Sequence, residues 1–319
     1  MMSAGTPEGR PSGGVVLKRV LLTGATGFLG RSAQAALGDR DYEVHGVARH
    51  PPTERSGVRW HSADLLEEDA VDGLFKSVAP THLLHLAWYT EPGSYWDSSE
   101  NDRWLRGSER LLHAFAAAGG LRAVVAGTCA EYDWSDAGGT LSEHHTPLAP
   151  RGAYGLAKDA LRRELEQWSA ETGFSSAWAR LFFLFGPGED PRRLVPSVTR
   201  QLLAGRPAEC SEGRQVRDYL LSSEAADALA ALLDSEVRGP VNVASGRGVA
   251  VRELVKLVGA STGRPELLRI GGLPGRTDDP PSLVANTGRL TREVGWTPDR
   301  ELAAWVDETV SWWRDRLRA

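Results

Sequence analysis

A tyrosine and a lysine one helical turn apart are the side chains of this sequence best suited to proton transfer. Tyr154 and Lys158 open a helical stretch that runs to Glu171, and residues at i and i+4 lie on one helix face. A tyrosine hydroxyl titrates at about pH 10, and a neighbouring ammonium favours the phenolate and lowers that pKa. Tyr154 is therefore the candidate acid or base. Most pairs at this spacing are solvated helix faces, so the interpretation needs support from other elements.

A threonine hydroxyl is predicted to lie beside this pair. Residues 121–128 form an apolar run that is typical of a buried strand, with Thr128 at its carboxyl end. Ligands of open α/β sheets bind at the carboxyl ends of the strands. We therefore expect Thr128 to hydrogen-bond the substrate oxygen that exchanges a proton with Tyr154.

A glycine-rich turn near the N-terminus predicts a dinucleotide site. The apolar run at 15–22 indicates a strand, and Gly24, Gly27 and Gly30 follow it with the spacing G-x-x-G-x-x-G before a helical stretch at 31–37. Such glycines let the turn close and let the backbone approach a pyrophosphate, while the helix N-terminus offers free N–H groups. Taken by itself, a turn of this kind can equally be structural.

The second and third predicted strands bear on the cofactor. Residues 42–49 end in Arg49, where an Asp or Glu would hold a ribose 2′-OH and an arginine can pair with a 2′-phosphate. NADP(H) is therefore favoured and NAD(H) remains possible, although exposed arginines at strand ends are common. After a third strand at 58–61, Asp64 is expected to reach the adenine amino group.

Strands and helices alternate along the remaining chain. A fourth strand at 81–87 and helices at 69–78 and 101–118 continue the pattern, which predicts right-handed crossovers and a parallel sheet covered on both faces. The loop at 89–97 follows a strand's carboxyl end and is expected to shape the substrate pocket. The fold class is therefore α/β.

Composition excludes several classes of function. The 319 residues are 41% hydrophobic and 25% charged with a net charge of -5, which argues against a nucleic-acid partner. No apolar run approaches the roughly 18 residues that cross a membrane. Cys129 and Cys210 form neither a disulfide framework nor a zinc motif, so we expect no metal and a cytoplasmic location. Residues 1–14 read as a flexible tail and not as a signal peptide.

These motifs together have the order and spacing of a known superfamily. From about residue 15 to 315 the chain resembles the extended short-chain dehydrogenases/reductases, in the NAD(P)-dependent epimerase/dehydratase branch that acts on nucleotide sugars. The resemblance rests on the glycine turn, Asp64, Leu86-Ala87, Thr128 and Tyr154-x-x-x-Lys158. It implies a doubly wound Rossmann domain of seven parallel strands with a smaller, discontinuous C-terminal substrate domain, and a homodimer. We expect residues 15–182 with 215–245 to bind NAD(P), and residues 183–214 with 246–319 to bind a nucleotide-diphosphate sugar.

The resemblance also assigns site residues. The catalytic residues would be Thr128, Tyr154 and Lys158, and Lys158 would also bind the nicotinamide ribose. Residues 216–219 resemble the family's V-R-D-Y/F element, whose arginine, here Arg217, binds the diphosphate. Arg276 matches a second such arginine, and two guanidinium groups suit the oxygens of a diphosphate. The expected cofactor-binding residues are Gly24, Thr26, Gly27, Phe28, Leu29, Gly30, Arg49, Asp64, Leu65, Leu86 and Ala87. The expected substrate-binding residues are Tyr89, Arg193, Leu194, Arg217 and Arg276.

Departures from the family pattern narrow the reaction. Sugar 4,6-dehydratases carry Asp-Glu after the catalytic threonine, where this chain has Cys129-Ala130, so elimination of water is not expected. Glu131 is interpreted as a solvated acid. Trp104 and Phe183 stand where family members usually carry asparagine.

The remaining residues suit hydride transfer to a sugar ketone. The sequence thus predicts an NADPH-dependent ketoreductase, acting at C4 of an NDP-4-keto-6-deoxyhexose with Tyr154 as proton donor. Two alternatives stay open. One is a nucleotide-sugar 4-epimerase with tightly bound NAD, and the other is a non-catalytic dinucleotide-binding sensor.

Overall fold

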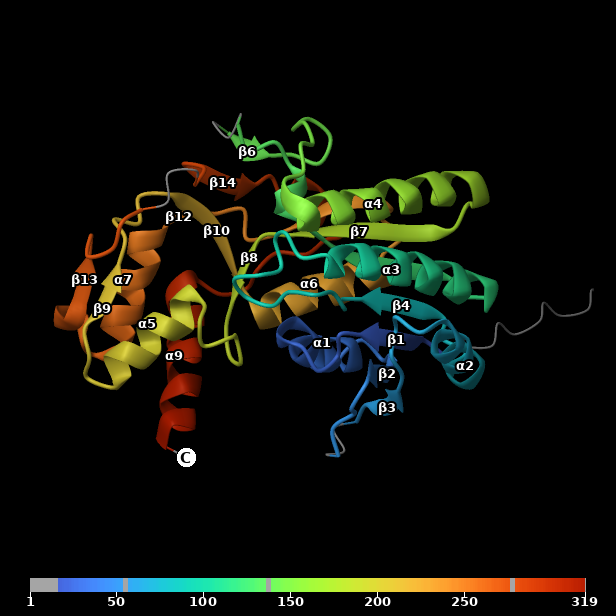
Figure 1. Cartoon of the computed structure of the whole chain (residues 1–319), viewed down its shortest axis with the longest axis horizontal. Helices are drawn as coiled ribbons and strands as arrows, with labels where there is room; N and C mark the ends of the chain where they lie inside the picture. Colours follow the sequence, from blue (N-terminus) through green and yellow to red (C-terminus); the bar gives the residue numbers. More distant parts are fainter. Residues whose placement is uncertain (1–16, 54–56, 136–138, 276–278, 319) are drawn as a thin grey trace, which may run out of the picture.

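The computed structural model describes residues 17–53, 57–135, 139–275 and 279–318. The predicted N-terminal tail and the candidate residue Arg276 lie outside the described residues. A large sheet, a smaller sheet, a two-stranded pair and the helices around them make up the described part of the chain (Figure 1).

The larger sheet has seven strands, all parallel, in the order β11-β7-β5-β4-β1-β2-β3. Its strands are short and largely buried, as expected for a sheet covered on both faces. This arrangement confirms the predicted Rossmann-type α/β fold. The strands are β1 (Arg19–Thr23), β2 (Glu43–Ala48), β3 (Arg59–Ser62), β4 (His82–His85), β5 (Arg122–Thr128), β7 (Ser175–Leu181) and β11 (Gly239–Val243).

Helices cover both faces because successive strand residues point to opposite sides. Val20 and Leu22 pack with α1 (Phe28–Gly38) and α6 (Ser222–Asp234). Leu21, from the same strand, packs on the other face. The helices of that second face are α2 (Glu68–Val78), α3 (Glu100–Ala117) and α4 (Gly152–Thr172). Leu112, Phe115 and Leu161 of these helices are buried against the sheet.

The chain leaves the larger sheet at Phe182. β8 (Phe183–Phe185) pairs with β10 (Val216–Leu221), which belongs to a smaller sheet of order β12-β10-β14-β6. This smaller assembly lies at the left of Figure 1. Its remaining strands are β6 (Thr140–Leu141), β12 (Gly248–Ala250) and β14 (Ser282–Ala285), beside the pair β9 (Ala208–Cys210) and β13 (Leu268–Ile270). Its helices are α5 (Leu194–Leu203), α7 (Val251–Thr262), α9 (Leu302–Arg318) and the 3-10 turn η2 (Pro265–Leu267), whereas α8 (Gly288–Arg292) packs against β11 of the larger sheet.

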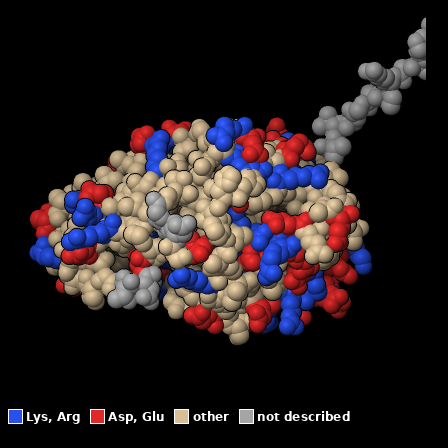
Figure 2. All heavy atoms as spheres, turned by 90° about the horizontal axis from the view of Figure 1, so that it is seen from above, with Lys and Arg blue, Asp and Glu red and all other residues tan. Residues whose placement is uncertain are grey.

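The lengths of the helices and the distribution of charged side chains bear on binding to membranes and nucleic acids. None of the helices in the described ranges is both long and apolar enough to span a membrane. Acidic and basic side chains are interspersed over the face that Figure 2 shows.

Candidate active site

One cavity of about 1130 Å3 runs along the carboxyl ends of the larger sheet. Gly24, Arg49 and Thr128 line it from the strand ends of that sheet, and Phe183 and Arg193 close it from the opposite side. Its volume exceeds the roughly 300–1,000 Å3 of a pocket for one small ligand. The cavity therefore has room for a cofactor together with a substrate.

The glycine turn is packed so closely that its glycines have little or no room for a side chain. Gly24 has φ +66°, and a Cβ there would lie 2.8 Å from the amide nitrogen of Ala87. A Cβ on Gly30 would lie 2.0 Å from the Gly24 carbonyl oxygen, and one on Gly27 would lie 3.1 Å from it. α1 begins immediately after Gly27, without a side-chain cap, so its free N–H groups are available to phosphate oxygens. These residues fit a dinucleotide.

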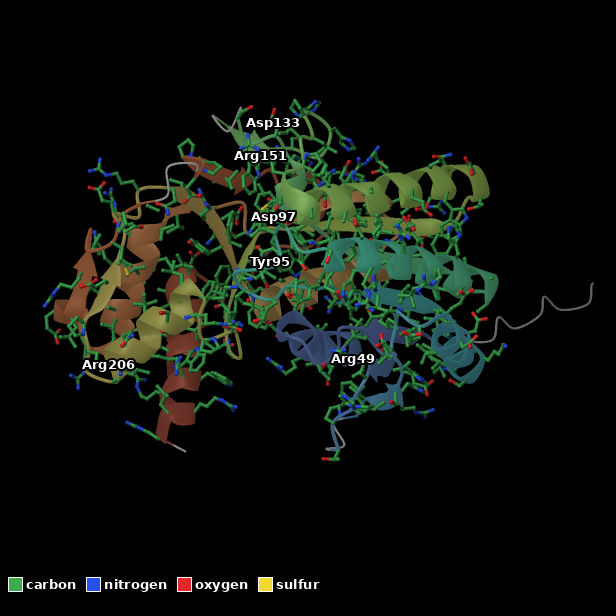
Figure 3. All side chains as sticks on the ribbon, viewed as in Figure 1. Arg49, Tyr95, Asp97, Asp133, Arg151 and Arg206 are labelled. Carbon is green, nitrogen blue, oxygen red and sulfur yellow. The ribbon has the colours of Figure 1, made fainter. Side chains whose placement is uncertain are left out.

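The predicted cofactor residues divide into two groups. Gly24, Thr26, Gly27, Phe28, Arg49, Asp64, Leu65 and Ala87 line the cavity. Leu29, Gly30 and Leu86 are not in its lining and build the turn from behind. The Asp64 carboxylate accepts a hydrogen bond from the Leu66 amide at 3.0 Å, which fixes the loop after β3. Arg49 is exposed near the end of β2 (Figure 3).

Thr128 and Tyr154 both line this cavity. Burial raises the pKa of Tyr154 above its ordinary value, and the nearby Thr128 side chain opposes that shift. The protein's own groups therefore keep the phenol protonated at neutral pH. The expectation that Lys158 lowers this pKa is not met in the protein alone, because desolvation dominates.

Lys158 is buried and does not line the cavity. Its ammonium donates to the Ala126 carbonyl oxygen at 2.8 Å and lies 3.7 Å from the ring centroid of Trp88. Burial lowers the pKa of Lys158 to about 7, although Glu131 acts in the opposite direction. The ammonium is thus close to its titration point at physiological pH.

The interpretation of Glu131 as a solvated acid is wrong. The 3-10 turn η1 (Cys129–Glu131) folds its carboxylate back beneath β5, where it has no exposed surface. The carboxylate accepts hydrogen bonds from the Thr128 amide at 2.9 Å, from Trp178 Nε1 at 2.9 Å and from Arg180 Nε at 2.7 Å. Glu131 therefore fixes the backbone of Thr128 from behind and does not face the cavity.

The predicted substrate residues are only partly brought together. Tyr89, Arg193 and Leu194 line the cavity. Arg217 does not: it is buried, donates to the Pro280 carbonyl oxygen at 2.9 Å and pairs with Asp279. Diphosphate binding by Arg217 would therefore require that ion pair to open.

Sequence reasoning missed an aromatic wall and a carboxyl group in this cavity. Tyr95 and Trp96 meet the Tyr154 ring edge-on at centroid distances of 5.0 and 5.8 Å, and Tyr95 lies between β8 and α3 (Figure 3). Their only signal was the aromatic composition of the loop at 89–97. Glu189 Oε2 is buried without a hydrogen-bond partner, and burial raises the pKa of Glu189 to about 8. An acid directly after Gly186-Pro187-Gly188 was its only signal.

Comparisons with known proteins agree with this geometry. The model of the NAD dependent epimerase/dehydratase family matches residues 20–244. A GDP-6-deoxy-D-mannose reductase of Pseudomonas aeruginosa is 28% identical over 94% of this chain and 99% of its own. A dTDP-4-dehydro-6-deoxy-D-allose reductase of Streptomyces bikiniensis is 27% identical over 94% and 98%.

Solved structures show the same fold. A UDP-glucose 4-epimerase of Thermus thermophilus in complex with NAD is 26% identical, with a TM-score of 0.82 over 93% of this chain and 99% of its own. The family match covers more than half of the chain and includes the glycine turn, Thr128, Tyr154 and Lys158. The chain therefore belongs to the NAD dependent epimerase/dehydratase family and is an NAD(P)-dependent enzyme of nucleotide-sugar chemistry.

Proposed function

We propose that this enzyme is an NADPH-dependent ketoreductase of a nucleotide-activated sugar, which reduces the C4 ketone of an NDP-4-keto-6-deoxyhexose. One observation carries the proposal: Thr128 and Tyr154 line one cavity together with the glycine turn. Beside them, Cys129 and Ala130 occupy the positions at which dehydratases carry their acid pair. Burial raises the pKa of the Cys129 thiol to about 12, so this side chain is a poor substitute for a carboxylate.

The residues divide the chemistry among them. A bound nicotinamide cofactor supplies the hydride. Tyr154, kept protonated by burial, donates a proton to the ketone oxygen as negative charge develops there. Thr128 hydrogen-bonds the same oxygen, and the ammonium form of Lys158, one helical turn from Tyr154, favours negative charge on the tyrosine. Arg49 pairs with the 2′-phosphate of NADPH, and Arg193 binds the substrate diphosphate, as bidentate guanidinium groups do.

Two kinds of relative bear on the reaction. The relatives of Pseudomonas aeruginosa and Streptomyces bikiniensis are both named as reductases of 6-deoxy sugars, which supports reduction. The Thermus relative is an epimerase with bound NAD, which supports the alternative of a 4-epimerase with tightly held NAD.

Further proposals concern the whole molecule. We propose a cytoplasmic homodimer, with residues 15–182 and 215–245 binding NAD(P) and residues 183–214 and 246–319 binding the nucleotide sugar. The free, buried Cys129 and Cys210 support the cytoplasmic location. The exposed Leu156 of α4, a helix that packs beside α3, supports the homodimer. Sedimentation velocity tests the oligomeric state.

The decisive experiment follows nicotinamide absorbance after the enzyme is mixed with NADPH, or separately NADH, and a dTDP-4-keto-6-deoxyglucose prepared in situ. We expect sugar-dependent loss of NADPH, and a fall of about 100- to 10,000-fold in kcat for Tyr154→Phe. Interconversion of sugar isomers on retained NAD would instead identify an epimerase. Full turnover by Tyr154→Phe would overturn the assigned proton donor.

A further inference from the structure

A tryptophan stands between the buried lysine and the cavity. Trp88 follows β4 and lines the cavity, whereas Lys158 lies behind it and does not. The separation of 3.7 Å between the Lys158 ammonium and the indole centroid is that of a cation–π contact. The indole therefore covers the side of the ammonium that would otherwise face a ligand.

The orientation of this indole is fixed by a second buried residue. Asn101, in the first turn of α3, has no exposed surface, and its side-chain oxygen accepts a hydrogen bond from Trp88 Nε1 at 2.9 Å. Its side-chain nitrogen donates to the carbonyl oxygens of Tyr95 at 2.7 Å and Ser98 at 2.9 Å. One amide thus holds both the cover of Lys158 and the loop whose Tyr95 ring packs on Tyr154.

We propose that Trp88 is a positioning residue of this active site, which keeps the Lys158 ammonium fixed and shielded from water behind an indole wall, with Asn101 holding the wall in place. The role in catalysis rests on the proposed function. Lys158 would then act on the site through its electrostatic field on Tyr154.

The groups around Lys158 explain why a cover matters. Glu131, beneath β5, favours the ammonium, while His85 of β4 stays neutral because burial and the Lys158 charge lower its pKa to about 3. Tyr154 precedes Lys158 by one turn of the same helix. Desolvation is the largest influence on the pKa of Lys158, and the indole is part of what excludes water. Removal of the indole admits water, which raises the pKa of Lys158, and it also ends the cation–π attraction, which lowers it. We expect the effect of water to be larger, because desolvation is the largest influence on this pKa.

The test follows lysine titration in the intact enzyme without cofactor or substrate. The chain has four lysines, Lys18, Lys76, Lys158 and Lys256, so labelling with 13Cε-lysine gives four NMR signals, and Lys158→Arg assigns the relevant one. We expect the wild-type signal to titrate at about 7, and Trp88→Leu to raise that value by about one unit or more. Trp88→Phe keeps an aromatic face and should restore the low value. Trp88→Met replaces Trp88→Leu if the latter fails to fold.

Trp104→Leu is the matched control, because Trp104 lines the same cavity with its ring 6.4 Å from that of Trp88, and it should leave the Lys158 titration in place. An unchanged titration in Trp88→Leu, or an equal rise in Trp104→Leu, overturns the proposal.

The pH profile of kcat/KM separates this inference from the proposed function. With a reducible sugar, the alkaline limb of the profile should move with the lysine pKa in Trp88→Leu, whereas a merely structural role would lower the rate at every pH. If Trp88→Leu raises the pKa of Lys158 but the enzyme reduces no sugar, the proposed reaction is wrong and the shielding of Lys158 by Trp88 stands. If the enzyme reduces the sugar but Trp88→Leu leaves the pKa of Lys158 unchanged, the shielding is wrong and the proposed reaction stands.

Discussion

The Glu131 carboxylate lies 2.7 Å from Nε of Arg180, and the two side chains are 0% and 1% exposed. The same carboxylate accepts a hydrogen bond from the Thr128 amide, so the buried ion pair is joined to the last residue of β5, which lines the cavity. Taking both charges out of water is costly, and the arrangement persists because hydrogen bonds from Trp178 and Thr128 complete it.

Removal of this carboxylate should be strongly destabilising. Glu131→Leu leaves the Arg180 charge buried without a carboxylate partner, which costs about 3–5 kcal/mol. Urea denaturation measures the free energy of unfolding. Lys256→Ala breaks an exposed pair with Glu253 at 3.0 Å and should change stability by no more than about 0.5 kcal/mol. Equal effects of the two substitutions would show that burial does not decide the contribution of this pair.

A methyl group in the glycine turn should disrupt cofactor binding. Gly30→Ala would bring a Cβ within 2.0 Å of the Gly24 carbonyl oxygen, and overpacking of this kind costs about 1–3 kcal/mol. We expect NADPH affinity, measured by fluorescence titration, to fall at least about 10-fold. Gly38→Ala is the control in the same helix, where no atom lies within 4 Å of the added Cβ. Normal NADPH binding by Gly30→Ala would contradict the close contact in the turn.

Arg49 should determine the choice between the two cofactors. Arg49→Ala removes a charge-assisted contact to a 2′-phosphate, and we expect NADPH affinity to fall about 10- to 100-fold while NADH affinity stays unchanged. Arg59→Ala, on the neighbouring strand with a side chain 70% exposed, is the control and should affect both cofactors equally. If Arg49→Ala weakened the binding of NADH as much as that of NADPH, Arg49 would not bind the 2′-phosphate.

Glu189 should make thermal stability depend on pH. Its folded pKa of about 8 lies above the unfolded value of 4.5, so its contribution to stability is complete below about 4.5 and is lost as pH rises to about 8. Glu189→Gln removes this dependence and should be more stable than wild type at about pH 8 by on the order of 2 kcal/mol, but not at about pH 5.

Melting curves at both pH values measure this difference. The exposed Glu209 provides the control Glu209→Gln, which should shift both curves alike. A constant difference between Glu189→Gln and wild type at the two pH values would argue against a buried, unpaired Glu189 carboxyl.

The sequence by itself determined the fold class and the principal chemistry. Apolar runs ending at Thr23 and Thr128 are local patterns, and glycine spacing and helical i, i+4 spacing follow from backbone sterics that need no tertiary context. These patterns are enough to predict that the turn, Thr128 and Tyr154 lie together at the carboxyl ends of the strands. The Rossmann-type fold follows from the alternation of strands and helices.

Only the tertiary structure decided the environment of those residues. Glu131 looked solvated in sequence because Arg180, 49 residues away, supplies its partner. Arg217 looked available for a ligand, but Asp279 and Pro280, brought to it by pairing of β10 and β14, occupy it. Lys158 is covered by Trp88 from another strand end. Burial and charge pairing depend on which distant segments pack together, and these long-range contacts set pKa values and access to the cavity.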